Sequence, residues 1–387
     1  MIWGRKREKS APKVGLILSG GGARAAYQVG VLKAIAKLLP RDTANPFPII
    51  CGTSAGAINA AAMASYSPQF HDGVMRLVRV WKNFHVNHVY RTDAMGVAKS
   101  GAHWFLAMML GGLGKYHPHS LLDRSPLRQL LRRDLSFDDI QKAIDEGAVD
   151  ALSITASSYF TGHSVNFCQS NENFEPWNRV RRQGVAANIG LNHLMASSAI
   201  PYVFSAVKIG DEYYGDGSMR QVAPISPALH LGAERVLVIG VRQEDEDIMP
   251  PHAEAQYPSL AQIAGHVLNS IFLDSVDSDL ERLKRINNTI GLIPNRRLQD
   301  GKTTLKPVDV LMIAPSEDIG KIAVEYGHLL PWTIRYLLKG IGGMRADGSN
   351  LLSYLLFEKA YCRALISLGY SDAMQRRDEI LNLLAPD

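Results

Sequence analysis

The chain has 387 residues, 46% of them hydrophobic and 20% charged, with a formal net charge of +5 at pH 7. These proportions are those of ordinary globular proteins and exclude a disordered or fibrous chain, and the length is enough for one large α/β domain with extensions. No stretch reaches the roughly 18 apolar residues that a membrane-spanning helix needs, so we expect a protein that is not integral to a membrane.

The N-terminal region is short and basic. Arg5, Lys6, Arg7 and Lys9 precede the first apolar run, which is too short for the core of a signal peptide. The cluster could meet an anionic surface such as phospholipid headgroups or nucleic acid, although a short charged run is more typical of a solvated tail. We interpret residues 1–12 as a basic tail and expect a cytoplasmic protein that could touch the inner membrane surface, with no nucleic-acid partner.

The chain contains three cysteines, Cys51, Cys168 and Cys362. Their odd number and wide separation, without a CxxC pair, favour a reducing compartment over a disulfide framework. No cluster with metal-ligand spacing and no acidic loop of the EF-hand type stands out, so we expect neither a metal ion nor a cofactor.

Short apolar runs bounded by turn residues predict six buried strands. They are Val14–Leu18, Ile49–Cys51, Ala151–Ala156, Val165–Cys168, Val236–Val241 and Val308–Ile313. Helical periodicity fills many of the gaps between them. This alternation predicts a largely parallel sheet with helices on both faces.

Capping residues and periodicity place several helices. Ser125 followed by proline, and Ser136 followed by two aspartates in the first turn, are typical helix starts. Apolar residues at helical spacing predict one long amphipathic helix from residue 259 to residue 287, with a face formed by Ile263, Val267, Ile271, Leu280 and Leu283. After residue 315 the pattern is almost wholly helical.

The segment from Gly101 to Gly114, GAHWFLAMMLGGLG, is apolar on nearly all sides and is bounded by glycines. It is too short to span a bilayer, so it fits either a core helix or a lid that touches lipid. The lid hypothesis would expose Trp104, Phe105, Met108, Met109 and Leu110.

The pentapeptide GTSAG, residues 52–56, lies between a short apolar strand and a helix-forming run. This context is typical of a nucleophile elbow, in which small flanking residues allow a tight turn that lifts a serine hydroxyl above the sheet edge, at the start of a helix dipole. GxSxG alone arises by chance in many chains, and a structural glycine turn is the alternative. In its context the pattern predicts Ser54 as a nucleophile, flanked by Gly52 and Gly56.

Three consecutive glycines, Gly20, Gly21 and Gly22, follow the first predicted strand, and Arg24 comes directly after them. Backbone N–H groups in such a turn, opening onto a helix N-terminus, can hold an anion or the oxyanion of an acyl-transfer transition state. Arg24 could add positive charge there, or it could only pack or pair beside an ordinary strand-to-helix turn.

Asp216 lies between two glycines, after a polar strand-like stretch. Taken alone, an Asp-Gly dipeptide usually marks only a turn. Together, however, GGGARA at 20–25, GTSAG at 52–56 and DGS at 216–218 resemble the motifs of the patatin-like phospholipase family in order and spacing. The stretch ASSAIP at 196–201 looks like another segment of that family, and the resemblance extends over about residues 14–241.

The resemblance implies a patatin-like three-layer α/β/α fold with a central, mostly parallel sheet. It implies a serine lipid acyl hydrolase, of the phospholipase A, lysophospholipase or esterase type, that needs no cofactor. Ser54 would be the nucleophile and Asp216 the base of a Ser–Asp dyad, and Gly20, Gly21, Gly22 and Arg24 would form the oxyanion hole. The substrate would be a lipid or another ester.

Because the pattern after residue 315 is almost wholly helical, we expect a catalytic domain over residues 13–315 and a helical C-terminal extension over residues 316–387. Two positions depart from the family pattern. Ala25 replaces the last glycine of the first motif, and Ser218 replaces a small apolar residue in the third. Both side chains are small enough to fit, so only the detailed backbone geometry is in question.

Two other enzyme interpretations compete with this one. Gly20, Gly22 and Ala25 also match the dinucleotide-binding fingerprint, with Asp42 about twenty residues later. In a dinucleotide-binding fold, however, the acidic residue lies at the end of a second strand, whereas Asp42 lies in a predicted loop after a helix. A Ser–His–Asp triad would need a histidine after the acid, and the candidates, none in a glycine-punctuated loop, are His230, His252 and His266.

A non-catalytic interpretation also stands. The chain could be a membrane-surface or protein-binding module that retains the fold without turnover, because a fold does not establish a function.

Overall fold

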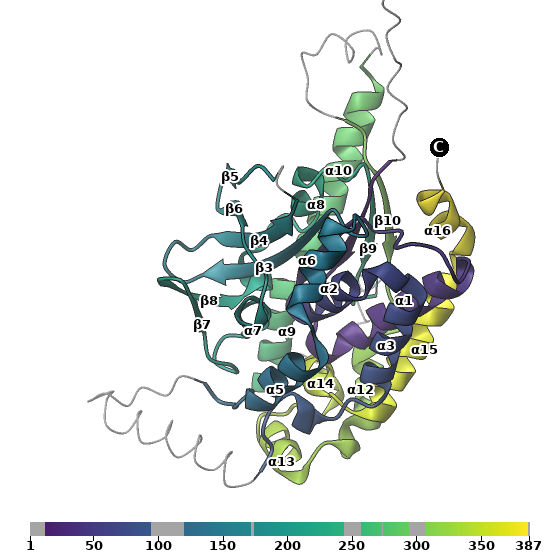
Figure 1. Ribbon diagram of the computed structural model, residues 1–387. Coiled ribbons are helices and arrows are strands. Elements are labelled where there is room, and N and C mark those ends of the chain that lie inside the picture. Colours follow the sequence, from purple (N-terminus) through teal and green to yellow (C-terminus); the bar gives the residue numbers. More distant parts are fainter. Residues whose placement is uncertain are drawn as a thin grey trace, which may run out of the picture.

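The structure is a computed structural model, and it describes residues 12–93, 120–171, 174–243, 257–272, 274–293 and 306–385 (Figure 1). The basic cluster of the N-terminal tail, the apolar segment 101–114 and His252 lie outside these ranges. Among the described helices, none combines the length and the apolar character needed to cross a bilayer.

A single ten-stranded sheet runs through the centre of the molecule (Figure 1). Its order is β10–β9–β1–β2–β3–β4–β6–β5, and β8 pairs with β3 and with β7 beside this path. The bounds are β1 Val14–Leu18, β2 Ile49–Thr53, β3 Ala151–Ser158, β4 Ser164–Ser170, β5 Trp177–Arg179, β6 Arg182–Ala186, β7 Val207–Ile209, β8 Glu212–Asp216, β9 Arg235–Ile239 and β10 Asp309–Ile313. The run from β10 to β3 is parallel throughout.

All six predicted strands are present, as β1, β2, β3, β4, β9 and β10. Their continuous apolar sequences fit parallel strands that are covered on both faces. The remaining strands, β5 to β8, are short and mostly polar, so no apolar run predicts them. They form antiparallel or edge pairings in which one side can face water.

Helices cover both faces of the sheet and complete a three-layer α/β/α arrangement (Figure 1). Side chains of β1 show the two faces, because Leu16 and Leu18 join the core under α1, α2 and α3, whereas Ile17 packs on the opposite face with residues of α8 and α10. The helices are α1 Ala26–Leu38, α2 Ala55–Ser65, α3 Phe70–Lys82, α5 Ser125–Asp134, α6 Phe137–Asp145, α7 Leu191–Ser197, α8 Ser226–His230, α9 Leu260–Phe272, α10 Asp274–Gly291, α12 Ile319–Tyr326, α13 Trp332–Gly340, α14 Ser349–Leu355, α15 Lys359–Gln375 and α16 Arg377–Leu384.

The helix starts at Ser125 and Ser136 are confirmed, the second as the N-cap of α6. The long helix predicted from 259 to 287 is described as α9 and α10, with residue 273 between them outside the described ranges. Its predicted apolar face is wrong at Ile263 and Val267, which are 41% and 49% exposed, whereas Ile271 packs against the core. The reason is that α9 turns a different side, including Ala261, toward α14 and the core.

The C-terminal helices pack directly on the N-terminal half of the chain. Helix α15 runs along α1, and a Cβ on Gly30 would lie 2.3 Å from the carbonyl oxygen of Ile366. One hydrophobic core contains both Leu16 of the sheet and Leu383 of α16. The region predicted as a helical extension is helical, and it shares its core with the sheet.

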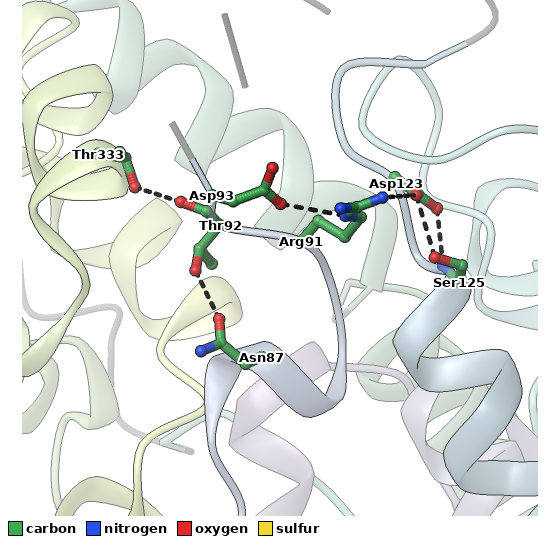
Figure 2. A network of polar contacts seen from close by, with 7 residues as sticks. All are labelled: Asn87, Arg91, Thr92, Asp93, Asp123, Ser125 and Thr333. Carbon is green, nitrogen blue, oxygen red and sulfur yellow. Dashed lines mark hydrogen bonds and ion pairs between the residues drawn. The ribbon is translucent and has the colours of Figure 1, made fainter. Parts of the chain in front are cut away.

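The chain on either side of residues 94–119 is held at one place, next to the start of α5 (Figure 2). The backbone N–H of Arg91 donates to the carbonyl oxygen of Asp123 at 2.9 Å, and the Arg91 guanidinium pairs with Asp93 and, at 4.0 Å, with Asp123. Thr333 of α13 donates to the carbonyl oxygen of Thr92 at 2.8 Å. These contacts fix both flanks of that segment against the helical C-terminal region and α5.

Candidate active site

Ser54 occupies the sharp turn between β2 and α2. Its backbone has φ 55° and ψ −125°, which a residue other than glycine rarely adopts. The turn needs small neighbours because α2 packs onto the end of β1: a Cβ on Gly56 would lie 2.2 Å from the carbonyl oxygen of Leu18. A Cβ on Gly52 would lie 2.6 Å from the carbonyl oxygen of Gly56. The residues predicted to form an elbow therefore form a tight strand–turn–helix junction.

The hydroxyl of Ser54 donates a hydrogen bond of 2.7 Å to Oδ2 of Asp216, and both side chains are buried. The other carboxylate oxygen, Oδ1, accepts from the backbone N–H of Ser218 at 3.0 Å. Asp216 is the last residue of β8 and pairs with Ala156 of β3, the strand next to β2. This pairing brings together two residues that are 162 positions apart in the sequence.

The Asp216 carboxyl group is a stronger base than an ordinary aspartate. Burial raises its pKa to about 6, although the hydrogen bonds from Ser54 and Ser218 and the positive charge of Arg124 oppose the increase. At neutral pH the group is still mostly ionised and can accept a proton.

Arg124 is a buried cation near the dyad that the sequence did not single out. It donates to the carbonyl oxygens of Met195 at 2.5 Å and Ser205 at 2.6 Å. Burial, together with Arg128, lowers its pKa to about 10, so it remains charged at neutral pH. The sequence predicted a helix start at the next residue, Ser125, but no pattern around it indicated a functional role for Arg124.

The three-glycine turn lies beside the Ser54 turn, because β1 and β2 are parallel neighbours with Leu18 opposite Gly52. Gly22 and Ser54 both line the same cavity. At Gly22 the backbone has φ 55°, and an added Cβ would lie 2.4 Å from the carbonyl oxygen of Tyr354, so only glycine fits.

Arg24 is buried and points its guanidinium at α14. Its Nε donates to Oγ of Ser353 and its Nη2 to Oδ1 of Asn350, both at 2.8 Å. The guanidinium also lies 4.2 Å from the centre of the Tyr354 ring, a cation–π distance. The sequence suggested added charge or surface pairing for Arg24, and nothing in it indicated these partners more than 300 positions away.

Ser197 supports the turn from the other side. The backbone N–H of Ser54 donates to Oγ of Ser197 at 2.9 Å, and that hydroxyl donates to the carbonyl oxygen of Thr155 at 2.6 Å. Two residues later, the carbonyl oxygen of Ala199 accepts from the backbone N–H of Asp216 at 2.9 Å. The ASSAIP stretch thus contacts both members of the pair. The family resemblance was the one signal that marked it.

An apolar cavity opens beside Ser54, and with its mouth it contains about 890 Å³ of space free of protein atoms. Its walls come from α2, α3, α5, the segment before β7 and the C-terminal region. Among the lining side chains are Ile58, Ala62, Leu77, Trp81, Phe84, Leu127, Leu131, Ile200, Phe204 and Phe357. The apolar lining suits an organic ligand with a large hydrocarbon part.

The histidines of a Ser–His–Asp triad and the acidic residue of a dinucleotide-binding fold are not found in the positions that those two interpretations require. His230 contacts the carbonyl oxygen of Ser226 and stacks on Trp177, and His266 is on α9. No histidine lines the cavity in the described part of the chain. Asp42 is exposed in the turn after α1, away from any strand end.

Within the described ranges, no group of three histidine, cysteine, aspartate or glutamate residues is arranged to hold a metal ion. The three cysteines are buried and free.

Comparison with known proteins matches residues 16–229 to the family model described as patatin-like phospholipase. A stretch of 55 residues is 44% identical to a cGAMP-activated phospholipase of Pseudomonas aeruginosa (strain BWHPSA011 / Pa011) and covers 14% of this chain and 16% of that protein. The matched stretch is thus a small part of that relative.

Two solved structures are similar at lower identity. VipD from Legionella pneumophila is 11% identical, with 96% of this chain and 67% of that chain covered and a TM-score of 0.38. Human GIVD cytosolic phospholipase A2, in complex with a methyl γ-linolenyl fluorophosphonate, is 13% identical, with 97% and 59% covered and a TM-score of 0.43.

Proposed function

Because the chain belongs to the patatin-like phospholipase family, we propose that it is a lipid acyl hydrolase that cleaves carboxylic esters through a Ser54–Asp216 dyad. The observation that carries the proposal is the 2.7 Å hydrogen bond from the Ser54 hydroxyl to a buried carboxylate at the edge of an apolar cavity. Nucleophile, base and a site for a hydrocarbon substrate meet there.

The reaction begins when Asp216 accepts the Ser54 proton while Oγ attacks the ester carbonyl carbon. The negative charge that develops on the carbonyl oxygen is stabilised by backbone N–H groups of the Gly20–Gly22 turn. Collapse of the tetrahedral intermediate expels the alcohol, which takes the proton from Asp216. Water then repeats the sequence on the acyl-enzyme and releases the fatty acid.

The test is a pair of isosteric or near-isosteric substitutions. Ser54→Ala deletes the nucleophile and Asp216→Asn deletes the base, and we expect each to lower kcat for ester hydrolysis on the order of 10⁴-fold or more while the protein stays folded. A fluorophosphonate probe should label the wild type at Ser54, as read by mass spectrometry of peptides, and should not label Ser54→Ala.

Two matched controls separate chemistry from folding. Ser67 is buried and donates to the carbonyl oxygen of Ala64, so Ser67→Ala removes a buried hydroxyl away from the dyad. Asp279 is a buried aspartate whose pKa is also raised by burial, and it accepts from the backbone of Ile225. Activity in Ser54→Ala, or equal losses in Asp279→Asn and Asp216→Asn, would contradict the dyad. Absence of labelling and turnover in the wild type would favour a non-catalytic binding module.

A further inference from the structure

The cavity beside Ser54 follows one face of helix α2. Ala55, Ile58, Ala62 and Tyr66 line it, and they recur every three or four residues from the nucleophile to the C-terminal end of the helix. An α-helix rises about 1.5 Å per residue, so the twelve steps from Ser54 to Tyr66 correspond to about 18 Å. Along this face of α2 the cavity lining therefore extends about 18 Å from Ser54.

The side chains that line the cavity are mostly apolar. Leu77 and Trp81 of α3 line it together with Leu127 and Leu131 of α5. The polar atom of Trp81 is already used, because its indole N–H donates to Oδ1 of Asn59 at 2.9 Å. A ligand in this cavity meets almost no hydrogen-bonding partner beyond Ser54, which suits a hydrocarbon chain.

Hydrogen bonds cross the far end of the cavity. The hydroxyl of Tyr66 donates to the carbonyl oxygen of Asp134 at 2.7 Å, and Ser65 Oγ donates to the carbonyl oxygen of Ser136 at 3.1 Å. These bonds tie the end of α2 to the connection between α5 and α6. The guanidinium of Arg76 lies 4.6 Å from the centre of the Tyr66 ring. Tyr66 is thus fixed in place where the cavity lining reaches the C-terminal end of α2.

We propose that this cavity binds one acyl chain of the substrate and that Tyr66 limits the chain to about 14 carbons. A C–C bond of about 1.52 Å with an angle near 111° advances an extended chain by about 1.25 Å per carbon, so about 18 Å holds about 14 carbons. The proposal rests on the proposed function, because it assumes that the acyl carbonyl is placed at Ser54. It makes Ala62 and Tyr66 the residues that determine chain length.

The two residues should shift the limit in opposite directions. Ala62 is eight residues from Ser54, about 12 Å along the helix, so Ala62→Leu should obstruct the cavity after about nine or ten carbons. Tyr66→Ala removes the aromatic ring at that position and should move the limit beyond 14 carbons. Tyr66→Phe keeps the ring, so it should keep the limit near its wild-type position. Ser67→Ala, next in sequence and outside the cavity lining, is the control whose profile should match the wild type.

The experiment measures kcat/KM for soluble aryl esters with saturated acyl chains of 4 to 18 carbons, each below its aggregation concentration. Each methylene that enters the cavity should raise kcat/KM about threefold to fourfold, until the limit is reached near 14 carbons. In Ala62→Leu the ratio of the 14-carbon to the 4-carbon rate should fall at least tenfold. Identical profiles in wild type, Ala62→Leu and Tyr66→Ala, or a wild-type profile that rises unbroken to 18 carbons, would overturn the proposal.

A binding measurement keeps this test independent of turnover. Calorimetric titration of Ser54→Ala with fatty acids of 8 to 18 carbons should show affinity that rises with length and levels off near 14 carbons. If no ester is hydrolysed but the titration shows this limit, the proposed catalytic function fails and the acyl-chain site remains. If esters are hydrolysed and neither measurement shows a limit, the site proposal alone fails. If Ala62→Leu does not fold, the chain-length limits of Tyr66→Ala and Tyr66→Phe are compared in the same assays. The proposal then requires a longer limit in Tyr66→Ala than in Tyr66→Phe.

Discussion

At Ser54 the backbone is held in a conformation that costs free energy, and Ser197 contributes to holding it. The N–H of Ser54 is buried and donates to Ser197 Oγ, so Ser197→Ala leaves that donor without its partner. The variant also loses the hydrogen bond that Ser197 Oγ donates to the carbonyl oxygen of Thr155, and the loss of these two buried bonds should lower the free energy of unfolding by about 1–3 kcal/mol. Because the elbow also loses its support, we expect kcat to fall clearly and KM to change little.

Steady-state kinetics with a soluble ester, together with urea unfolding, measures both effects. Ser67→Ala is the control, since it removes a buried serine hydroxyl bonded to a carbonyl oxygen at the other end of α2. It should lose stability without the loss of kcat. If the two variants lost kcat equally, Ser197 would be a structural residue with no role in positioning the nucleophile.

Asp216 links activity to pH through its raised pKa. In the proposed mechanism Asp216 is the base and must be ionised, so kcat/KM should fall about tenfold per pH unit below about pH 6 and level off above it. The measurement is a pH profile of kcat/KM with a soluble ester between pH 4.5 and 8.5. A kcat/KM that stays level down to pH 4.5 would mean that burial does not raise the pKa of the proposed base.

The same shift has a consequence for stability. Because the pKa in the folded protein is above the ordinary value of 3.8, protonated Asp216 contributes stability that is complete below about pH 4 and is lost as pH rises through about 6. Asparagine cannot ionise, so the free energy of unfolding of Asp216→Asn minus that of the wild type should increase from pH 4 to pH 8. A difference that stayed constant over this range would contradict the raised pKa.

At the scale of elements, α14 holds the three-glycine turn through Arg24. The guanidinium bonds to Ser353 and Asn350, and the carbonyl oxygen of Tyr354 lies where a side chain on Gly22 would be. We therefore expect Arg24→Ala to reduce kcat on the order of 10²-fold, less than the loss of Ser54, because the backbone donors remain but are less well placed. Asn350→Ala removes one of the two acceptors of Arg24 and should also lower kcat.

Arg24→Lys separates a geometric from an electrostatic role. Lysine keeps the charge but lacks the planar fork that reaches two acceptors, so we expect little recovery of kcat. Arg363, which donates to the carbonyl oxygen of Lys82 on the exposed side of α15, supplies the control Arg363→Ala. Substantial recovery in Arg24→Lys would show that the charge matters more than the bonds to α14.

Local patterns in the sequence predicted the centre of the fold, and the family resemblance was needed to pair Ser54 with Asp216, whereas long-range packing determined the rest. Buried parallel strands need continuous apolar runs, so six strands were readable, whereas the short polar strands that position Asp216 obtain their stability from pairing with β3. The motif glycines predicted the turns at Ser54 and Gly22. The partners of Arg24 and the walls of the cavity could not be predicted, because they depend on how α3, α5 and α14 pack.

At the scale of the whole molecule, the C-terminal helices complete the site. Tyr354, Leu355 and Phe357 line the cavity together with Ser54 and Gly22. The division predicted from the sequence, a catalytic domain up to residue 315 and an extension after it, therefore separates Ser54 from part of the cavity that we propose as the substrate site. We propose that the two regions fold and unfold as one cooperative unit.

The crossing of α1 and α15 tests this cooperativity. A Cβ on Gly30 would lie 2.3 Å from the carbonyl oxygen of Ile366, so Gly30→Ala forces the two helices apart and should cost about 1–3 kcal/mol. If the molecule is one unit, far-UV circular dichroism and loss of ester hydrolysis should shift together to a lower Tm in a single transition. Gly340→Ala at the end of α13, where a Cβ would meet nothing within 4 Å, should leave Tm unchanged or slightly higher. Two separate transitions in Gly30→Ala, with the sheet region still folded at the original Tm, would show instead that the C-terminal helices form an independent domain.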